Sequence, residues 1–535
     1  MSDGPDRVEL YDTTLRDGAQ REGISWSLDD KRRIVRRLDA LGIDIIEAGW
    51  PGSNPKDAEF FARAGDLGLQ HAVLAAFGAT RRAGIKAAED PSVVALVESG
   101  TPVCTIFGKT SVLHVTEVLR TTLDENLAMI ADTVAYLRGA GRRVIYDAEH
   151  FFDGDLLDPA YALATLRAAA DAGAESIVLC DTNGGSLPWH IEARVAAIRA
   201  ALPGVRLGIH AHDDAGCATA NSLAAVKAGA RHVQGTINGY GERCGNANLC
   251  TIVPGLVLKL GVECAAAAHL PELPEVARVV AELANLAPDD HAPYIGRSAF
   301  AHKGGVHVAA IRRCATSYEH VDPARVGNAT RVVVSELSGR ANLLARADEL
   351  GLELASSSSS ADVLAQVKAR EAGGASFEAA DASVALMLRR HQPGYTAPFT
   401  VVEYRVLSHG GPADRAGAEA TVKLRIGDRT VHTAAEGDGP VHALDAALRK
   451  ALVPTFPVVA RIALADYKVR ILDGHAGTSA VTRVLIDFTD GDRGWSTVGA
   501  SASILEATWT ALTDGIEHGI ATSHAETLLS AEAHA

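Results

Sequence analysis

Short apolar runs alternate with amphipathic segments through the first half of the chain. The runs have the length and bounding turns of buried strands, and the segments between them repeat apolar residues at helical spacing. One segment carries Ile34 and Leu38 on one face, begins with Ser27 and Asp30 spaced as a capping pair, and ends at Gly42. The expected strands are residues 8–11, 43–47, 72–77, 102–107, 143–146, 176–180, 206–212 and 232–237.

Eight strand and helix units within residues 8–260 predict an α/β fold, a (β/α)₈ TIM barrel. In this fold the chemistry is carried by loops at the C-terminal ends of the strands. Polar residues gather at these ends, namely Arg16 and Asp17 after strand one, Glu47 ending strand two, Glu149 after strand five, Thr182 after strand six, His210 and His212 ending strand seven, and Asn246 after strand eight. We therefore expect one active site at the barrel mouth.

The pair His210 and His212 is the first candidate for a metal site. Residues at i and i+2 of a strand project from the same face, so both imidazoles can bind one divalent ion if a carboxylate reaches them. Asp17 is the expected carboxylate. Taken alone, the pair fits two hydrogen-bonded core histidines better than a metal site, but convergence on one mouth favours the metal.

Composition narrows the function classes. The formal net charge is −15 and no basic run occurs, which argues against nucleic acid or an anionic membrane as the partner. No apolar run is long enough to span a bilayer, and the first residues lack a signal-peptide pattern. The seven cysteines include no Cys-x-x-Cys pair. We expect reduced thiols and a cytoplasmic protein.

The pattern changes twice beyond the barrel, so we expect three domains. Residues 1–268 form the barrel, residues 269–395 a helical linker region, and residues 396–535 an α+β domain. The serine run 356–360 is expected to be an exposed loop. The pattern of residues 396–535 predicts two βββα repeats, in which the sequence GDR occupies matching turns at 427–429 and 491–493. Two such repeats side by side form a cleft suited to a small effector.

Several motifs are specific enough to indicate a family. LYDTTLRDGAQ occupies residues 10–20 and GYGERCGNA residues 239–247; with Glu47, His210 and His212 they resemble the DRE-TIM metallolyases, which include 2-isopropylmalate, homocitrate and citramalate synthases. GWPGSNPKD at 49–57, FGKTS at 107–111, YDAEHFFDG at 146–154 and CDTNGG at 180–185 resemble the (R)-citramalate synthase branch. The chain departs from the family at Asp213, where Asn is usual, and at ASIL 502–505, where an Asn-Ile-Ile type sequence is usual.

The resemblance implies an acyltransferase that condenses acetyl-CoA with pyruvate and hydrolyses the thioester to give (R)-citramalate, in isoleucine biosynthesis through 2-oxobutanoate. It also implies one divalent ion, Zn²⁺, Mn²⁺, Mg²⁺ or Co²⁺, held by Asp17, His210, His212 and Asn246. Such an ion acts as a Lewis acid on the ketone of the 2-oxo acid.

The family's roles extend to residues around the ion. Glu149 resembles the residue assigned to proton transfer, Arg16 is placed to neutralise oxygen charge, and Glu47 has a catalytic or a purely structural role beside Arg16. The residues expected to bind substrate are Arg16, Gln20, Thr182, Phe77, Phe107 and Tyr146, the last three as bulky walls that favour the methyl of pyruvate.

Two later segments also resemble the family. FAHKGGVHV at 300–308 resembles a linker motif that reaches an active site, commonly that of the partner subunit, which makes His307 the candidate auxiliary acid or base, ahead of His302 and Tyr318. Without the resemblance to the family, the sequence indicates only that His302 and His307 are surface residues at a glycine hinge. The last domain resembles an allosteric domain, which implies isoleucine binding near Gly477, Thr478 and Ala480, with a dimerisation domain that has lost regulation as the alternative. We expect a homodimer.

Other activities remain open at this point. The same catalytic set serves 2-isopropylmalate or homocitrate synthases, which use other 2-oxo acids. A catalytically silent metal- and amino-acid-binding sensor would lack Arg16, Glu149 or His307, and all three are present. A retro-aldol lyase is less consistent with the C-terminal duplication.

Overall fold

The computed structural model describes residues 7–335, 338, 340–352, 357–411 and 414–532. The chain divides into two compact units, one of residues 1–300 and 321–329, the other of residues 301–320 and 330–535. We describe each unit by itself.

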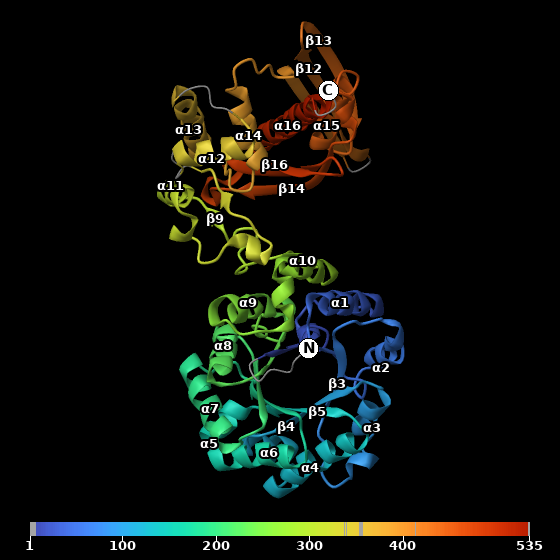
Figure 1. The fold of residues 1–535 in the computed structure, drawn as a ribbon. Coiled ribbons are helices and arrows are strands. Elements are labelled where there is room, and N and C mark those ends of the chain that lie inside the picture. The colour runs from blue at the N-terminus through green and yellow to red at the C-terminus, as the bar shows by residue number, and fades with distance from the viewer. Residues whose placement is uncertain (1–6, 336–337, 339, 353–356, 412–413, 533–535) are drawn as a thin grey trace. The chain divides into compact units, whose positions relative to one another are not determined.

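The first unit is a closed parallel barrel in which β1 pairs with both β2 and β8, so the predicted TIM barrel is confirmed. Figure 1 shows helices around the ring of strands. The strands are β1 (Glu9–Asp12), β2 (Ile45–Gly49), β3 (Val73–Ala79), β4 (Val103–Lys109), β5 (Arg143–Glu149), β6 (Ser176–Asp181), β7 (Arg206–Ala211) and β8 (His232–Gly235). The helices are α1 (Leu28–Leu41), α2 (Pro55–Ala62), α3 (Pro91–Glu98), α4 (Leu123–Gly139), α5 (Phe151–Leu157), α6 (Pro159–Asp171), α7 (Pro188–Ala201), α8 (Ala218–Ala228), α9 (Leu249–Pro254) and α10 (Leu273–Leu283).

Helix α1 shows how local sequence sets these elements. Ser27 and Asp30 form a reciprocal capping box at its start, and Gly42 ends it with a φ of 86°, a left-handed conformation that suits glycine. Ile34 and Leu38 are fully buried on its inner face. The predicted helix limits are therefore confirmed.

Alternation along the strands separates two cores. Side chains such as Tyr11, Ile45 and Val178 fill the barrel interior, whereas their sequence neighbours pack between the strands and the helices. Because successive side chains of a strand face opposite sides, strand parity decides which residues reach the mouth.

The second unit contains the two predicted βββα repeats, each an antiparallel three-stranded sheet followed by a helix (Figure 1). The first repeat has β11 (Thr400–Gly411), β12 (Asp414–Ile426), β13 (Arg429–Gly437) and α15 (Pro440–Leu452); the second has β14 (Ala463–Ile471), β15 (Thr482–Thr489), β16 (Gly494–Ser501) and α16 (Ile504–Glu532). Buried apolar side chains of β12, β15, α15 and α16 form one shared core.

The rest of this unit consists of helices and a short parallel pair of strands. These elements are β9 (Ala301–His302), α11 (Gly305–Arg313), β10 (Arg331–Val332), α12 (Arg340–Glu349), α13 (Ser357–Ala372) and α14 (Asp381–Arg390). The serine run 356–360 was predicted to be an exposed loop. This prediction is wrong for residues 357–360, which begin α13, and Ser356 lies outside the described residues. The hydroxyl oxygen of serine accepts hydrogen bonds from the free backbone N–H groups of a first helical turn, so a serine run is also compatible with the start of a helix.

Within the described part of the chain, no single helix is long and apolar enough to cross a membrane; only the pair Leu249–Leu260 and Ala265–Leu283, bent by 116°, passes the same criteria together.

Candidate active site

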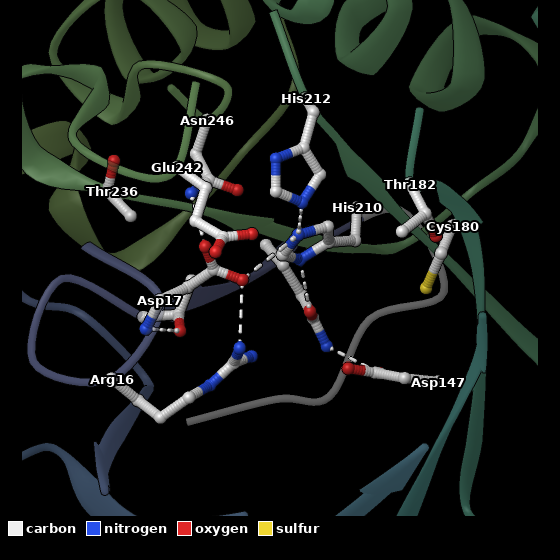
Figure 2. A network of polar contacts seen from close by, with 12 residues as sticks. Arg16, Asp17, Asp147, Cys180, Thr182, His210, His212, Thr236, Glu242 and Asn246 are labelled. Atoms are coloured by element: carbon white, nitrogen blue, oxygen red, sulfur yellow. Dashed lines mark hydrogen bonds and ion pairs between the residues drawn. The ribbon is translucent and has the colours of Figure 1, made fainter. Parts of the chain in front are cut away.

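Three predicted metal ligands meet at the barrel mouth. The ligand atoms of Asp17, His210 and His212 lie within 4.8 Å of one another, and all three side chains are buried. The two Nε2 atoms of the histidines are 3.2 Å apart, and His210 Nε2 is 3.7 Å from Asp17 Oδ2. Figure 2 shows the three side chains pointing toward one another.

Each donor is positioned by the end of a strand. Asp17 lies in the turn after β1, which is closed by a hydrogen bond from Gly18 N–H to Thr13 O. His210 is on β7, and His212 lies just beyond the strand, where it forms an isolated antiparallel bridge with Asn246. Strand seven is therefore one residue shorter than predicted, and His212 is held both by this bridge and by a hydrogen bond from its N–H to the carbonyl of Asp181 on β6.

Asn246, the fourth predicted ligand, lies beside these three side chains. Its Nδ2 donates to Asp17 Oδ1 at 2.8 Å and to the carbonyl of Tyr240 at 3.1 Å. Its Oδ1 is buried and has no hydrogen-bond partner among the described residues. A buried oxygen without a hydrogen-bond partner lowers the stability of the fold unless a bound ligand contacts it. A set of two imidazoles, one carboxylate and one amide oxygen fits a divalent ion.

The charge states of these side chains also fit cation binding. Burial raises the pKa of Asp17, but the positive charge of Arg16 and the nearby imidazoles outweigh it and hold the pKa well below its usual value. Burial, reinforced by His210, lowers the pKa of His212 to about 4. Near neutral pH the site therefore offers an anionic carboxylate and a neutral imidazole of His212, the forms that bind metals.

Arg16 lies beside the donors and has three contacts. Its Nε donates to Glu47 Oε1 at 2.6 Å, its Nη1 donates to Asp17 Oδ2 at 2.8 Å, and its guanidinium lies 3.7 Å from the ring centroid of Phe77. Glu47 is fully buried and also accepts from Tyr11 and Thr13, at 2.5 Å each. Glu47 is thus occupied by hydrogen bonds that fix Arg16, which favours the structural alternative for this carboxylate.

Glu149 is the last residue of β5 rather than part of the following loop. It forms an ion pair with Lys109, the last residue of β4. Next to it, the His150 N–H donates to Thr182 Oγ1 at 2.8 Å, which joins the ends of β5 and β6. These contacts bring a carboxylate, a cation and a hydroxyl to the same rim.

Aromatic side chains form one wall of the mouth. Phe77 and Phe107 stack with centroids 5.5 Å apart, and Trp50, which the sequence reading did not select, contacts both rings edge-on. Tyr146 lies elsewhere: it is fully buried on the outer face of β5, where its hydroxyl donates to Gly108 O at 3.4 Å. The structure thus corrects the expectation that Tyr146 lines the mouth, because its strand parity is opposite to that of Glu149.

The remaining barrel predictions are placed as follows. Gln20 is exposed at the end of the short helix Gly18–Gln20 and borders a cavity of about 240 Å³ that Arg16 also lines. Asp213, the departure from the family, accepts the N–H of Ala218 at 2.8 Å, at the first residue of α8. This is a helix-start contact that Asn can also make.

Two polar residues of the barrel interior escaped the sequence reading. Gln234 on β8 and Asp147 on β5 are buried and hydrogen-bonded to each other, and Gln234 also contacts His210. The available signal was polar residues at alternate positions, His232 and Gln234, on an otherwise apolar strand.

The predicted residues of the linker and the last domain lie in the second unit. His307 is exposed and stacks on Tyr318 with centroids 4.2 Å apart, while His302 Nε2 lies 3.8 Å from Glu319 Oε1. Burial lowers the pKa of His302. The effector candidates Gly477 and Thr478 lie in the 3₁₀ turn Gly474–Ser479, directly before Ala480.

Comparison with known families agrees with this architecture. Residues 7–280 match the HMGL-like family, residues 294–373 the homocitrate synthase post-HMGL domain-like family, and residues 378–520 the LeuA allosteric (dimerisation) domain. The barrel is therefore an HMGL-like domain, and its mouth carries the buried cluster of Asp17, His210 and His212.

Curated relatives narrow the assignment. The chain is 53% identical to "(R)-citramalate synthase" of Synechocystis sp., over 96% of each chain, and 51% identical to "(R)-citramalate synthase" of Streptomyces coelicolor, over 96% of this chain and 97% of the relative. Identity falls to 30% with "2-isopropylmalate synthase" of Methanocaldococcus jannaschii, over 96% and 94% of the two chains. The chain belongs to the (R)-citramalate synthase family.

Proposed function

We propose that this chain condenses acetyl-CoA with pyruvate and hydrolyses the resulting thioester, releasing CoA and (R)-citramalate for isoleucine biosynthesis. The observation that carries the proposal is the convergence of Asp17, His210, His212 and Asn246 beside Arg16 at the mouth of an HMGL-like barrel. Near full-length relatives that bear the synthase name support the choice of substrates.

Asp17, His210, His212 and Asn246 are the residues proposed to hold one divalent ion. Three of them offer buried ligand atoms within 4.8 Å of one another, and Asn246 contributes a buried oxygen without a partner among the described residues. When bound, the ion supplies Lewis acidity toward the ketone and carboxylate of the 2-oxo acid. Zn²⁺, Mn²⁺, Co²⁺ and Mg²⁺ all suit mixed oxygen and nitrogen donors.

Glu149 is proposed to remove a methyl proton from acetyl-CoA. A thioester α-proton is weakly acidic, so the base must be held at the reacting carbon, and the ion pair with Lys109 restrains this carboxylate. Arg16 is proposed to neutralise the negative charge that develops on oxygen, because its guanidinium stays charged and is fixed by Glu47. Thr182 is the proposed contact for the substrate carboxylate.

The aromatic wall supports pyruvate as the acceptor. Phe77 and Phe107, which Trp50 contacts edge-on, reduce the space available to an acceptor side chain near Arg16. A methyl group fits such a wall better than the isopropyl group of 2-oxoisovalerate. Hydrophobic pockets discriminate by one methylene only ~10–200-fold, so the wall contributes a preference rather than an absolute rule.

The second unit is proposed to carry regulation, dimerisation and catalytic assistance. The match to a LeuA allosteric (dimerisation) domain supports self-association. We assign isoleucine binding to the region of Gly477, Thr478 and Ala480, and auxiliary acid or base chemistry to His307, with His302 and Tyr318 as its alternatives. The proposed domain limits remain residues 1–268, 269–395 and 396–535.

The test is CoA release by the metal-loaded chain with pyruvate, 2-oxobutanoate, 2-oxoisovalerate and 2-oxoglutarate as separate acceptors. We expect the highest kcat/KM with pyruvate. A preference for 2-oxoisovalerate or 2-oxoglutarate would assign the chain instead to 2-isopropylmalate or homocitrate synthesis. If no acceptor gives CoA release while metal and isoleucine both bind, the chain is a sensor and the proposal is wrong.

A further inference from the structure

A hydrogen-bonded group of buried side chains lies in the barrel directly behind the candidate metal ligands. At its centre is Gln234 on β8, which is fully buried. Its Oε1 lies 2.8 Å from Nδ1 of His210, and its Nε2 lies 2.9 Å from Oδ1 of Asp147 on β5. Figure 2 shows this network reaching from His210 to Asp147. The group therefore connects three strands of the barrel through one amide.

We infer that Gln234, oriented by Asp147, is a positioning residue that fixes the ring and tautomer of His210 for metal binding. The inference rests on the proposed metal site. Metal-binding histidines commonly donate their second ring N–H to a fixed acceptor, which sets the direction of the ligand nitrogen. Gln234 is this acceptor for His210.

The surroundings of Gln234 determine which end of its amide faces His210. Asp147 Oδ1 accepts a hydrogen bond whether or not the acid is protonated, because a proton can lie on the other oxygen. His232 presents a second acceptor, since its Nδ1 is 2.8 Å from Glu9 Oε2 and its Nε2 is 3.4 Å from Gln234 Nε2. Both N–H bonds of the amide thus have acceptors away from His210. Only the amide oxygen remains for the imidazole.

The tautomer of His210 follows from this orientation. An amide oxygen can only accept, so Nδ1 of His210 carries the proton and Nε2 keeps its lone pair. That Nε2 is the atom 3.2 Å from His212 Nε2 and 3.7 Å from Asp17 Oδ2. The lone pair is therefore directed toward the other donors before any ion arrives.

His212 provides an internal contrast. Its Nδ1 is buried but has no hydrogen-bond partner among the residues described. Of the two histidines, His210 alone has a side-chain acceptor of this kind within that part of the chain. The ring of His210 is therefore fixed by a hydrogen bond at its Nδ1, whereas His212 is held through its backbone by the bridge to Asn246.

The decisive experiment measures Mn²⁺ affinity in full-length chains, with free Mn²⁺ quantified by electron paramagnetic resonance. Gln234→Met keeps the side-chain length and removes the hydrogen bonds of the amide to His210, Asp147 and His232; we expect the Kd for Mn²⁺ to rise ~10–100-fold. Asp147→Asn preserves shape but allows the amide of Gln234 to turn over, so a smaller rise is expected. Ser222→Ala is the control, because it removes one buried hydrogen bond, to Ala218 O on α8, outside the site.

A second measurement separates positioning from general stability. At saturating Co²⁺ the visible spectrum reports the ligand geometry, so we expect it to change in Gln234→Met and to remain unchanged in Ser222→Ala. Thermal unfolding without metal records any loss of stability in each variant. A merely structural Gln234 would lower the unfolding temperature and leave the Co²⁺ spectrum intact.

The outcomes also separate this inference from the proposed function. If the unsubstituted chain binds no Mn²⁺, the metal site itself is wrong. If it binds Mn²⁺ and folded Gln234→Met gives the same Kd and Co²⁺ spectrum, only the positioning role is overturned. If Gln234→Met does not fold, an unchanged Kd in Asp147→Asn overturns the inference.

Discussion

The two ends of the barrel are both rich in charged side chains but differ in how those charges are satisfied. At the N-terminal end, Glu9 accepts from His232 and Arg143, and Arg143 also pairs with Glu175 at 2.7 Å. At the mouth, Asn246 Oδ1 is buried without a partner among the described residues, and the Nε2 atoms of His210 and His212 face each other at 3.2 Å. Paired charges at one end stabilise the fold, whereas unmatched lone pairs at the other are available to a ligand.

The largest effect is expected from removing a donor at the mouth. His210→Ala should lower kcat/KM at least ~10³-fold, because the proposed Lewis acid loses a ligand. This decrease corresponds to an activation free energy several kcal/mol higher. Thermal unfolding of the metal-free chain should occur at a somewhat lower temperature, because the substitution leaves Gln234 Oε1 without its hydrogen-bond partner. Steady-state CoA release and calorimetry measure the two quantities. Unchanged kcat/KM in His210→Ala would remove His210 from the metal site.

The next effect concerns the proposed base. Glu149→Gln keeps the shape of the side chain and cannot accept the proton, so we expect kcat to fall by ~10²–10⁴-fold. Metal affinity should stay unchanged, which distinguishes this variant from His210→Ala. Rapid-quench assays with Mn²⁺ titration test both statements. Full activity in Glu149→Gln would remove this residue from the mechanism.

At the opposite end, Glu9→Gln should affect stability and leave catalysis intact. Burial raises the pKa of Glu9, but the hydrogen bond that it accepts from His232 and the positive charges of Arg206 and Arg143 outweigh burial and lower the pKa from 4.5 to about 2. Ionised Glu9 therefore stabilises the fold above pH 4.5, and this contribution disappears as the pH falls toward 2. The loss in Glu9→Gln at neutral pH is about 3 kcal/mol.

Urea unfolding at pH 7 and pH 3 tests this prediction. The difference between Glu9→Gln and the unsubstituted chain should be large at pH 7 and less than half as large at pH 3. Turnover at pH 7 should be retained, because glutamine at position 9 still accepts the N–H of His232. A difference that does not depend on pH would show that the ionised carboxylate is not what stabilises this end.

The smallest effect is expected at the aromatic wall. Phe107→Ala should shift the ratio of kcat/KM for 2-oxobutanoate over pyruvate upward by ~10–200-fold, because it opens space for one methylene. Tyr146→Phe is the matched control: it lies on the outer face of β5 and should leave the ratio unchanged. Equal shifts in both variants would mean that the wall does not select the acceptor.

The fold was largely predictable from the sequence because its signals are local and repeated. The strand runs, the caps of α1 and the two βββα repeats each follow from residue spacing. The convergence of Asp17, His210, His212 and Asn246 was predictable because a barrel brings strand ends to one rim.

What the sequence did not predict depends on side-chain direction. Tyr146 and Glu149 lie near each other in sequence but face opposite sides of β5, and the expected end of that strand was three residues too early. Gln234 and Asp147 were missed because their meaning comes from contacts between strands distant in sequence. Glu47 was left open between two roles until its three hydrogen-bond donors could be seen.

The hydrogen bond from Asn246 to Asp17 joins residues 229 positions apart. During synthesis, Asp17 leaves the ribosome long before its partners on β7 and after β8 exist, so the donor set assembles only when β1 pairs with β8 and the ring closes. Ion binding at the proposed metal site therefore requires the closed ring of strands. Nascent chains arrested before Asn246 has emerged are expected to retain no ion at this site, and divalent metal is then expected to stabilise only those molecules whose barrel has closed.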